Sequence, residues 1–282
     1  MKYFTSNYIF VYNSRIHYIS GGRGEGPPLI MIHGLGGSWT NWSLSLPFFI
    51  ESYRCFALDL LGFGSSDKPD IFYSIPFYTD LIKGFMEALH IERGVLIGHS
   101  MGGHIALDFA LRYPSSLGCV ILVNPYGAHH PNPVKQFLLR LVTDKKGGIR
   151  FINDLTIRLA IERLFYRKGS TCKEMVKFYR DLSRSSQREA LSRAFTRTAK
   201  SMLTYSLRHK LHDIKIPALI IAGKNDRVIP PRDTIYIRQS IPHAKLVTLD
   251  ACGHMAHLER PEVFAKLVLD FLQSEALFES RP

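Results

Sequence analysis

Short, uninterrupted runs of apolar residues recur along the chain and alternate with segments of helical spacing. Four such runs are residues 27–32, 95–98, 118–123 and 218–222. A strand that is apolar at successive positions is buried on both faces, which is typical of a parallel sheet covered by helices. The alternation therefore predicts an α/β fold with a doubly wound, mostly parallel sheet.

The two ends of the chain fit the same plan. Residues 8–20 are predicted to form two strands, because apolar and polar positions alternate in this region. Near the C-terminus, Pro261 stands at a position that favours the first turn of a helix. On that helix we expect Val263, Leu267 and Phe271 to pack on the sheet.

The strand pattern stops between residues 126 and 210. Four segments of this region read as helices: 135–142, 149–166, 172–182 and 186–203. Because apolar strands resume afterwards, we interpret 126–210 as an inserted helical cap, or lid. The core is then formed by residues 1–125 and 211–282.

Positive charge is concentrated in this insertion. The chain has a formal net charge of +12, and residues 131–205 contain 17 Lys or Arg against 6 Asp or Glu, which gives +11. The basic residues alternate with apolar ones at helical spacing, so the first interpretation is a solvated helical face. The alternative is peripheral contact with an anionic membrane or an anionic substrate. We find no nucleic-acid-binding motif and predict no such partner.

Composition excludes several other classes of protein. No apolar run reaches the roughly 18 residues of a membrane-spanning helix. The first residues lack the apolar core of a signal peptide, so we expect a cytoplasmic protein. The cysteines show no zinc-type spacing, so we expect buried thiols and predict no metal site. They are Cys55, Cys119, Cys172 and Cys252.

A serine stands at the junction of a predicted strand and a predicted helix, in the sequence GHSMGG at 98–103. Strand, tight turn and helix are the context of a nucleophile elbow. A serine hydroxyl needs a base, and the base needs an orienting carboxylate. Asp226 and His254 each follow a later strand, in the order serine, acid, histidine. These residues predict a Ser100–Asp226–His254 triad.

Four motifs together resemble the α/β-hydrolase superfamily, specifically its members with a helical cap. They are HGLGG at 33–37, DLLGFGSSDKP at 59–69, GHSMGG at 98–103, and GKNDRVIP at 223–230 with CGHMAHLERPEVF at 252–264. The resemblance implies an eight-stranded, mostly parallel sheet flanked by helices. It also implies that Ser100 is the nucleophile, His254 the base and Asp226 its partner. The backbone N–H groups of Leu35 and Met101 would form the oxyanion hole.

Several neighbouring residues compete for these roles. Asp59 is a second acidic candidate, which we interpret as organising a turn. Some family members place the acid after the sixth strand, where this chain has Asn124, an amide that cannot stabilise an imidazolium as a carboxylate does. His257 follows His254 closely and is expected to line the pocket or to pack behind the site. We name five candidates for substrate binding: Gly34, Gly36, His257, Phe137 and Phe165.

The motifs favour a serine hydrolase that cleaves carboxylic esters through an acyl-enzyme and needs no cofactor. The expected substrates are small esters with a short to medium acyl chain, or monoacylglycerol-like esters. One alternative is a carbon–carbon bond hydrolase of the meta-cleavage product type. These enzymes usually carry Asn before the serine and Trp after the histidine, where this chain has His99 and Met255. Another alternative is a ligand receptor that retains the triad.

Overall fold

The computed structural model describes residues 3–129 and 153–275. Its eight strands form one sheet in the order β1-β2-β4-β3-β5-β6-β7-β8. The strands are β1 (Phe4–Val11), β2 (Ser14–Gly21), β3 (Gly26–Ile32), β4 (Tyr53–Leu58), β5 (Gly94–His99), β6 (Leu117–Val123), β7 (Ala218–Gly223) and β8 (Ala244–Leu249). β2 is antiparallel to β1 and β4, and all other neighbours are parallel. The predicted eight-stranded, mostly parallel α/β sheet is confirmed.

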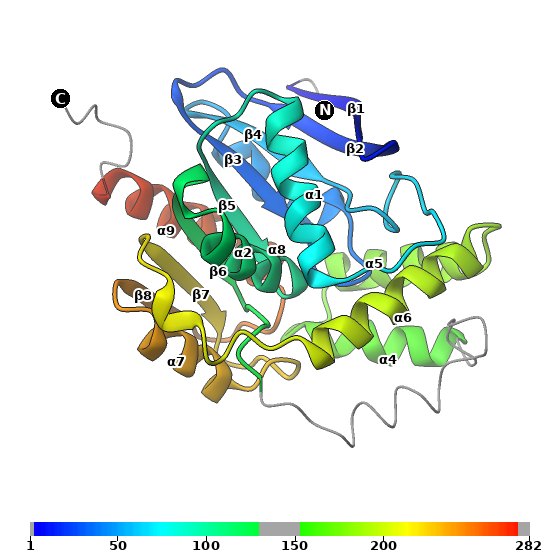
Figure 1. Cartoon of the computed structure of the whole chain (residues 1–282). Coiled ribbons are helices and arrows are strands. Elements are labelled where there is room, and N and C mark those ends of the chain that lie inside the picture. Colours follow the sequence, from blue (N-terminus) through cyan, green and yellow to red (C-terminus); the bar gives the residue numbers. More distant parts are fainter. Residues whose placement is uncertain (1–2, 130–152, 276–282) are drawn as a thin grey trace.

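Helices cover both faces of this sheet, and three more lie together beside it (Figure 1). The α-helices are α1 (Ile75–Ala88), α2 (Met101–Arg112), α4 (Asp154–Leu164), α5 (Ser170–Ser183), α6 (Arg188–Thr204), α7 (Pro231–Ser240), α8 (Ala256–Glu259) and α9 (Pro261–Ser274). Short 3₁₀ helices are η1 (Trp39–Trp42), η2 (Leu46–Phe48), η3 (Pro114–Ser116) and η4 (Leu211–Asp213).

Each central strand contributes to two apolar cores, one on each face of the sheet. In β5, Leu96 joins the core that contains Phe85 of α1, whereas Val95 and Ile97 join the core that contains Phe264 of α9. Successive side chains of a strand point to opposite faces, so a strand covered on both sides must be apolar throughout. This is the physical reason for the uninterrupted apolar runs in the sequence.

The first two strands form the expected hairpin. Tyr12 and Asn13 connect them, with φ values of 51° and 59°. Two positive φ values are typical of a tight turn whose twist matches that of the flanking strands. The prediction of two strands in this region is therefore confirmed, although β1 starts earlier than expected, at Phe4.

The helix that begins at Pro261 packs on the sheet with a face different from the one expected. Phe264, Val268 and Phe271 are buried, whereas Val263 is 46% exposed. The ring of Phe264 lies 6.2 Å from that of Trp42 and 6.2 Å from that of Phe49, and these contacts fix the helix face. The expectation for Val263 was wrong, because spacing alone allows two adjacent faces of this helix.

α4, α5 and α6 lie between β6 and β7 in the chain, within the predicted cap. They correspond to three of the four helices expected there, and the segment 135–142 lies outside the described residues. These helices line a cavity together with residues that follow β3, β5, β7 and β8. The division into core and cap at 126–210 thus stays a prediction with which the observed elements agree.

The remaining expectations concern membranes and cysteines. Within 3–129 and 153–275, no helix is both long and apolar enough to cross a bilayer. All four cysteines are buried and carry free thiols. Burial raises the pKa of the thiols of Cys55 and Cys252 to about 12, so both are neutral near pH 7.

Candidate active site

Ser100 occupies a strained turn between β5 and α2. Its backbone dihedral angles are φ 53° and ψ −110°, a conformation that non-glycine residues rarely adopt. Three backbone hydrogen bonds hold it: its N–H donates to Val123, and its carbonyl accepts from His104 and Tyr126. A side chain at Gly98 would collide with the backbone of Gly102, so this tight turn requires glycine. The structure thus gives Ser100 the backbone of a nucleophile elbow.

Asp226 and His254 form a buried pair beside this turn. Nδ1 of His254 lies 2.7 Å from Oδ2 of Asp226, and both side chains are only 3% exposed. The other carboxylate oxygen accepts hydrogen bonds from the backbone N–H groups of Val228 (2.7 Å) and Ile229 (3.0 Å). These bonds fix the carboxylate and therefore the plane of the imidazole.

The surroundings of Asp226 favour its charged form. Burial acts to raise the pKa of this carboxyl, but the hydrogen bond from His254, electrostatic interaction with the same ring, and the N–H groups of Ile229 and Val228 lower the pKa below its ordinary value. An ionised Asp226 accepts the proton on Nδ1 of His254. The second ring nitrogen, Nε2, is then left unprotonated and can act as a base.

Asn124 is a partner of the acid that sequence reasoning did not assign. Its Nδ2 donates a 2.7 Å hydrogen bond to Oδ2 of Asp226, the same oxygen that faces His254. Asn124 directly follows β6 with φ 44°, and its backbone N–H donates to the carbonyl of Ile221 in β7, the strand that leads to Asp226. Its position after the sixth strand, where some family members carry the acid, was the signal in the sequence that Asn124 lies near the triad.

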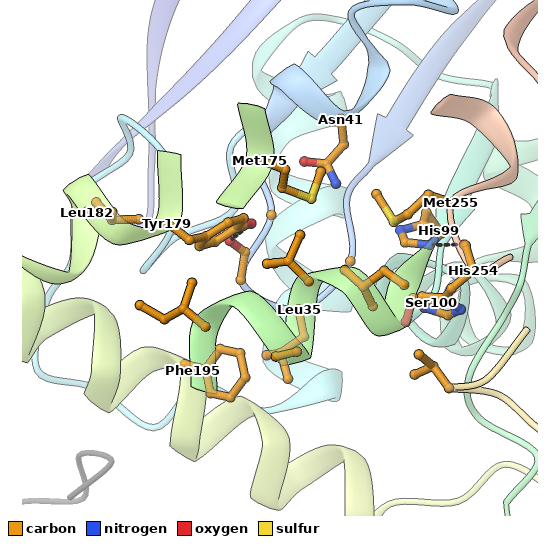
Figure 2. Close-up of a pocket in the computed structure, with 18 of the residues that line it drawn as sticks. Leu35, Asn41, His99, Ser100, Met175, Tyr179, Leu182, Phe195, His254 and Met255 are labelled. Carbon is orange, nitrogen blue, oxygen red and sulfur yellow. Dashed lines mark hydrogen bonds between the residues drawn. The ribbon is translucent and has the colours of Figure 1, made fainter. Parts of the chain in front are cut away.

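His99, the residue before the nucleophile, supports the loop of His254. Its Nε2 donates a 2.9 Å hydrogen bond to the carbonyl oxygen of His254. Burial, and next the nearby His257 and His254, lower the pKa of His99 well below its ordinary value, so the ring is neutral. Figure 2 shows His99, Ser100, His254 and Met255 gathered at one end of the cavity.

His257 packs behind the site and is not among the residues that line the cavity. Its ring is fully buried, 4.5 Å from the Trp42 ring and 4.6 Å from the His99 ring. Burial lowers its pKa to about 3, so it carries no charge near neutral pH. His257 thus takes the second of its two expected places, behind the site. The expectation that it binds substrate was wrong, because the rings of Trp42 and Phe264 enclose it.

The loop after β3 brings Leu35 to the cavity. Gly37 N–H bonds to the Gly34 carbonyl at 2.9 Å, and His33 Nδ1 donates to the same oxygen at 2.7 Å. Tyr179 of α5 donates a 2.6 Å hydrogen bond to the carbonyl of Gly36. Gly34, Leu35 and Gly36 border the same cavity as Ser100. Their contact with a substrate stays a prediction, and so does the oxyanion hole at Leu35 and Met101.

Asp59 does not enter the site. Its carboxylate accepts hydrogen bonds from the N–H groups of Trp39 (2.7 Å) and Ser65 (2.8 Å) and lies 2.8 Å from Nδ1 of His17. These contacts join three segments around a turn, which agrees with the interpretation of Asp59 as a turn organiser.

The cavity has a volume of about 540 Å³ and is lined mostly by apolar side chains. The cap helices supply Ile157, Ile161, Leu164, Met175, Leu182, Leu191, Phe195 and Met202. Figure 2 shows Tyr179, Leu182 and Phe195 at the end away from Ser100. Asn41 and Arg188 are among its polar lining residues. A volume of this size suits a small organic substrate with an apolar part.

Phe165 was expected in the pocket, but the structure places it elsewhere. Phe165 is 3% exposed and packs among Cys172, Val176 and Leu258, away from the cavity lining. The expectation for Phe165 was wrong, because an apolar residue in a cap can serve the contacts between helices as well as the pocket. Phe137 lies outside the described residues.

Comparison with known proteins identifies the family. Residues 27–261 match the family model described as the alpha/beta hydrolase fold. The chain is 30% identical to a 2-hydroxy-6-oxononadienedioate/2-hydroxy-6-oxononatrienedioate hydrolase of Paraburkholderia phymatum, over 95% of this chain and 96% of that one. It is also 30% identical to a 2-hydroxy-6-oxo-6-phenylhexa-2,4-dienoate hydrolase of Comamonas testosteroni, over 92% and 91%. The chain belongs to the alpha/beta hydrolase family and is a hydrolase.

A solved structure adds a different kind of relative. It is described as a membrane phospholipase A and bacterial virulence factor, and it shares 25% identity. The two structures superpose with a TM-score of 0.83 over 96% of this chain and 86% of that one. Relatives with the same fold are therefore named as hydrolases of different substrates.

Proposed function

We propose that this hydrolase works through an acyl-enzyme on Ser100. His254, oriented by ionised Asp226, takes the proton of the Ser100 hydroxyl as the oxygen attacks a carbonyl carbon. The negative charge on the carbonyl oxygen is stabilised by the N–H groups of Leu35 and Met101, each worth about 3 kcal/mol of barrier. The observation that carries the proposal is the buried 2.7 Å Asp226–His254 pair beside the strained Ser100 turn.

The same pair completes the reaction. Protonated His254 gives its proton to the leaving atom, which departs with the bonding electron pair. His254 then removes a proton from water, whose oxygen attacks the ester of Ser100 and releases the acid. No step requires a metal or an organic cofactor.

Our first candidate reaction is cleavage of a carbon–carbon bond, as in the hydrolysis of meta-cleavage products, in which the leaving atom is carbon. Curated relatives with 30% identity over nearly the whole chain are named for hydrolysis of dienoate or dienedioate compounds, which are carboxylates. Among the described residues that line the cavity, Arg188 has the one permanently cationic side chain. Arg188 can therefore pair with the carboxylate of such a substrate while its apolar part fills the cavity.

Ester oxygen as the leaving atom is the second candidate, and specific observations favour it. His99 and Met255 replace the Asn and Trp usual in the carbon–carbon hydrolases, and both line the cavity next to Ser100. The predominantly apolar lining suits an acyl chain. The relative described as a phospholipase A is named for ester cleavage.

A substrate comparison separates the two candidates. The purified protein is assayed with 2-hydroxy-6-oxo-6-phenylhexa-2,4-dienoate and with p-nitrophenyl esters of increasing acyl length. A higher kcat/KM for the dienoate supports carbon–carbon cleavage, and measurable turnover of the esters alone supports ester cleavage. In the first case Arg188→Gln raises KM for the dienoate, whereas Arg238→Gln on α7 serves as the exposed control. Labelling by a fluorophosphonate without turnover of either class would favour the receptor alternative.

A further inference from the structure

The helices that cover the cavity carry a surplus of positive charge. Residues 153–205 contain 12 Lys or Arg against 5 Asp or Glu, a net charge of +7. Two of the acidic side chains are each shared by two basic ones: Asp154 by Arg180 and Arg184, and Glu162 by Arg158 and Lys168. Local ion pairing therefore leaves this surface strongly cationic.

α4 also exposes two large apolar side chains on its outer face. Leu155 is 62% exposed and Leu159, four residues later and therefore on the same face, is 57% exposed. On the helical wheel Arg158 flanks them on one side and Arg163 on the other. The opposite face of α4 lines the cavity, for example with Ile161. The outer leucines are thus not needed for the packing of α4 on the body of the protein.

These leucines lie beside the opening of the cavity. Thr156 and Ala160, each next in sequence to one of the leucines, are exposed and also line the cavity. Val228 is 39% exposed and borders the cavity as well. The cavity therefore reaches the surface along the side of α4 that adjoins Leu155 and Leu159.

We propose that the outer face of α4 docks on an anionic lipid bilayer. Two leucines inserted at the boundary between headgroups and acyl chains lose contact with water. Arg158, which pairs with Glu162, and Arg163, whose Nε donates to the Arg227 carbonyl, hold positive charge beside them at the level of the phosphates. The remaining positive charge of the cap is attracted to the anionic surface. Docking in this orientation places the cavity opening against the membrane. This proposal does not depend on which bond the enzyme cleaves.

A second copy of the chain fits this surface less well. Two cationic caps repel each other, and two leucines form an apolar patch that is small for a stable dimer. An anionic bilayer matches both the charge and the apolar residues.

Binding to vesicles tests the proposal directly. The Ser100→Ala protein is used, so that no lipid can be hydrolysed, and is sedimented with vesicles of phosphatidylcholine alone or with added phosphatidylglycerol. We expect binding to rise with phosphatidylglycerol and to fall as salt is added. In this background, Leu155→Ser with Leu159→Ser lowers binding roughly tenfold or more. Lys173→Gln with Lys177→Gln, on the exposed face of α5, lowers it by about fivefold for each charge.

Matched variants and a solution measurement decide the outcome. Ile235→Ser with Val263→Ser removes two exposed apolar side chains outside the cap and leaves binding unchanged. Circular dichroism and thermal melting confirm that each variant is folded. The proposal is overturned if phosphatidylglycerol has no effect, or if the Leu155/Leu159 variant binds as well as its parent. A dimer in sedimentation equilibrium that this variant dissociates would assign the surface to a second copy instead.

Discussion

The backbone N–H of His254 donates a 2.7 Å hydrogen bond to the carbonyl oxygen of Leu164, the last residue of α4. The loop that carries the proposed base is therefore attached to a cap helix that lines the cavity. Glu259 reinforces this attachment, because one carboxylate oxygen accepts from Gly253 N–H and the other from Tyr166 N–H, both at 2.8 Å. The position of the imidazole thus depends on the end of α4.

Replacing Glu259 tests this dependence. Glu259→Ala removes the charged acceptor of the Gly253 and Tyr166 N–H groups, and each of these bonds is worth about 1.5–3 kcal/mol. We expect kcat to fall roughly tenfold or more, with a lower Tm. Glu259→Gln keeps one acceptor oxygen and should recover part of kcat. Glu262→Ala, exposed on α9, is the matched control. An unchanged kcat in Glu259→Ala would show that the base needs no such support.

Asp226 should make stability depend on pH. Its pKa in the folded protein is lowered, so its ionised form stabilises the fold above the unfolded-state pKa of about 3.9, and this contribution is lost as pH falls through the lower folded value. We expect the difference in unfolding free energy between wild type and Asp226→Asn to be largest near neutral pH and to shrink in acid. Urea titrations from neutral to acidic pH measure it. A difference that is constant with pH would contradict the lowered pKa.

A carboxylate at position 124 should be able to replace that of Asp226 as the partner of His254. The Asn124 side chain already lies 2.7 Å from the carboxylate oxygen that faces His254. Asp226→Asn alone should lower kcat by roughly 10³–10⁴-fold, as expected when the base loses its orienting charge. The double variant Asn124→Asp with Asp226→Asn restores a carboxylate and should recover at least about tenfold. No recovery in a folded double variant would mean that position 124 cannot orient His254.

Phe195 should limit the length of the substrate. It lines the cavity at the end away from Ser100 (Figure 2). Phe195→Ala enlarges this end, so we expect kcat/KM to shift toward longer acyl or aryl groups, by about 10–200-fold for each methylene accommodated. Phe178→Ala is the matched control, because Phe178 is 45% exposed on α5 and does not line the cavity. Equal changes in the two variants would exclude a specific role for Phe195.

The sheet could be predicted because its physical requirement is local. A strand that contributes to two cores must be apolar at successive positions, as β5 is at Val95, Leu96 and Ile97. Such a run of apolar residues is directly visible in the sequence. The buried face of a helix is harder to predict from the sequence. Val263 and Phe264 are adjacent and both apolar, and the contact of Phe264 with distant Trp42 decides which one is buried.

The positions of Ser100, Asp226 and His254 at strand ends could also be predicted, since strand order and motifs define them. The partners that hold them could not. Asn124 meets Asp226 across 102 positions of the sequence, and His99 meets the His254 carbonyl across 155. Phe165 and Phe195 have the same chemistry and both lie in the cap, but only the packing of the helices separates the core residue from the lining residue.

Labelling combined with substitution tests whether Ser100 is the nucleophile. The protein is treated with a fluorophosphonate, the modified peptide is mapped, and hydrolysis is compared for wild type, Ser100→Ala and the exposed control Ser43→Ala. We predict modification at Ser100, normal activity in Ser43→Ala, and a loss of kcat of roughly 10⁴-fold or more in folded Ser100→Ala. Modification at another residue, or hydrolysis that survives in Ser100→Ala, would show that Ser100 is not the nucleophile.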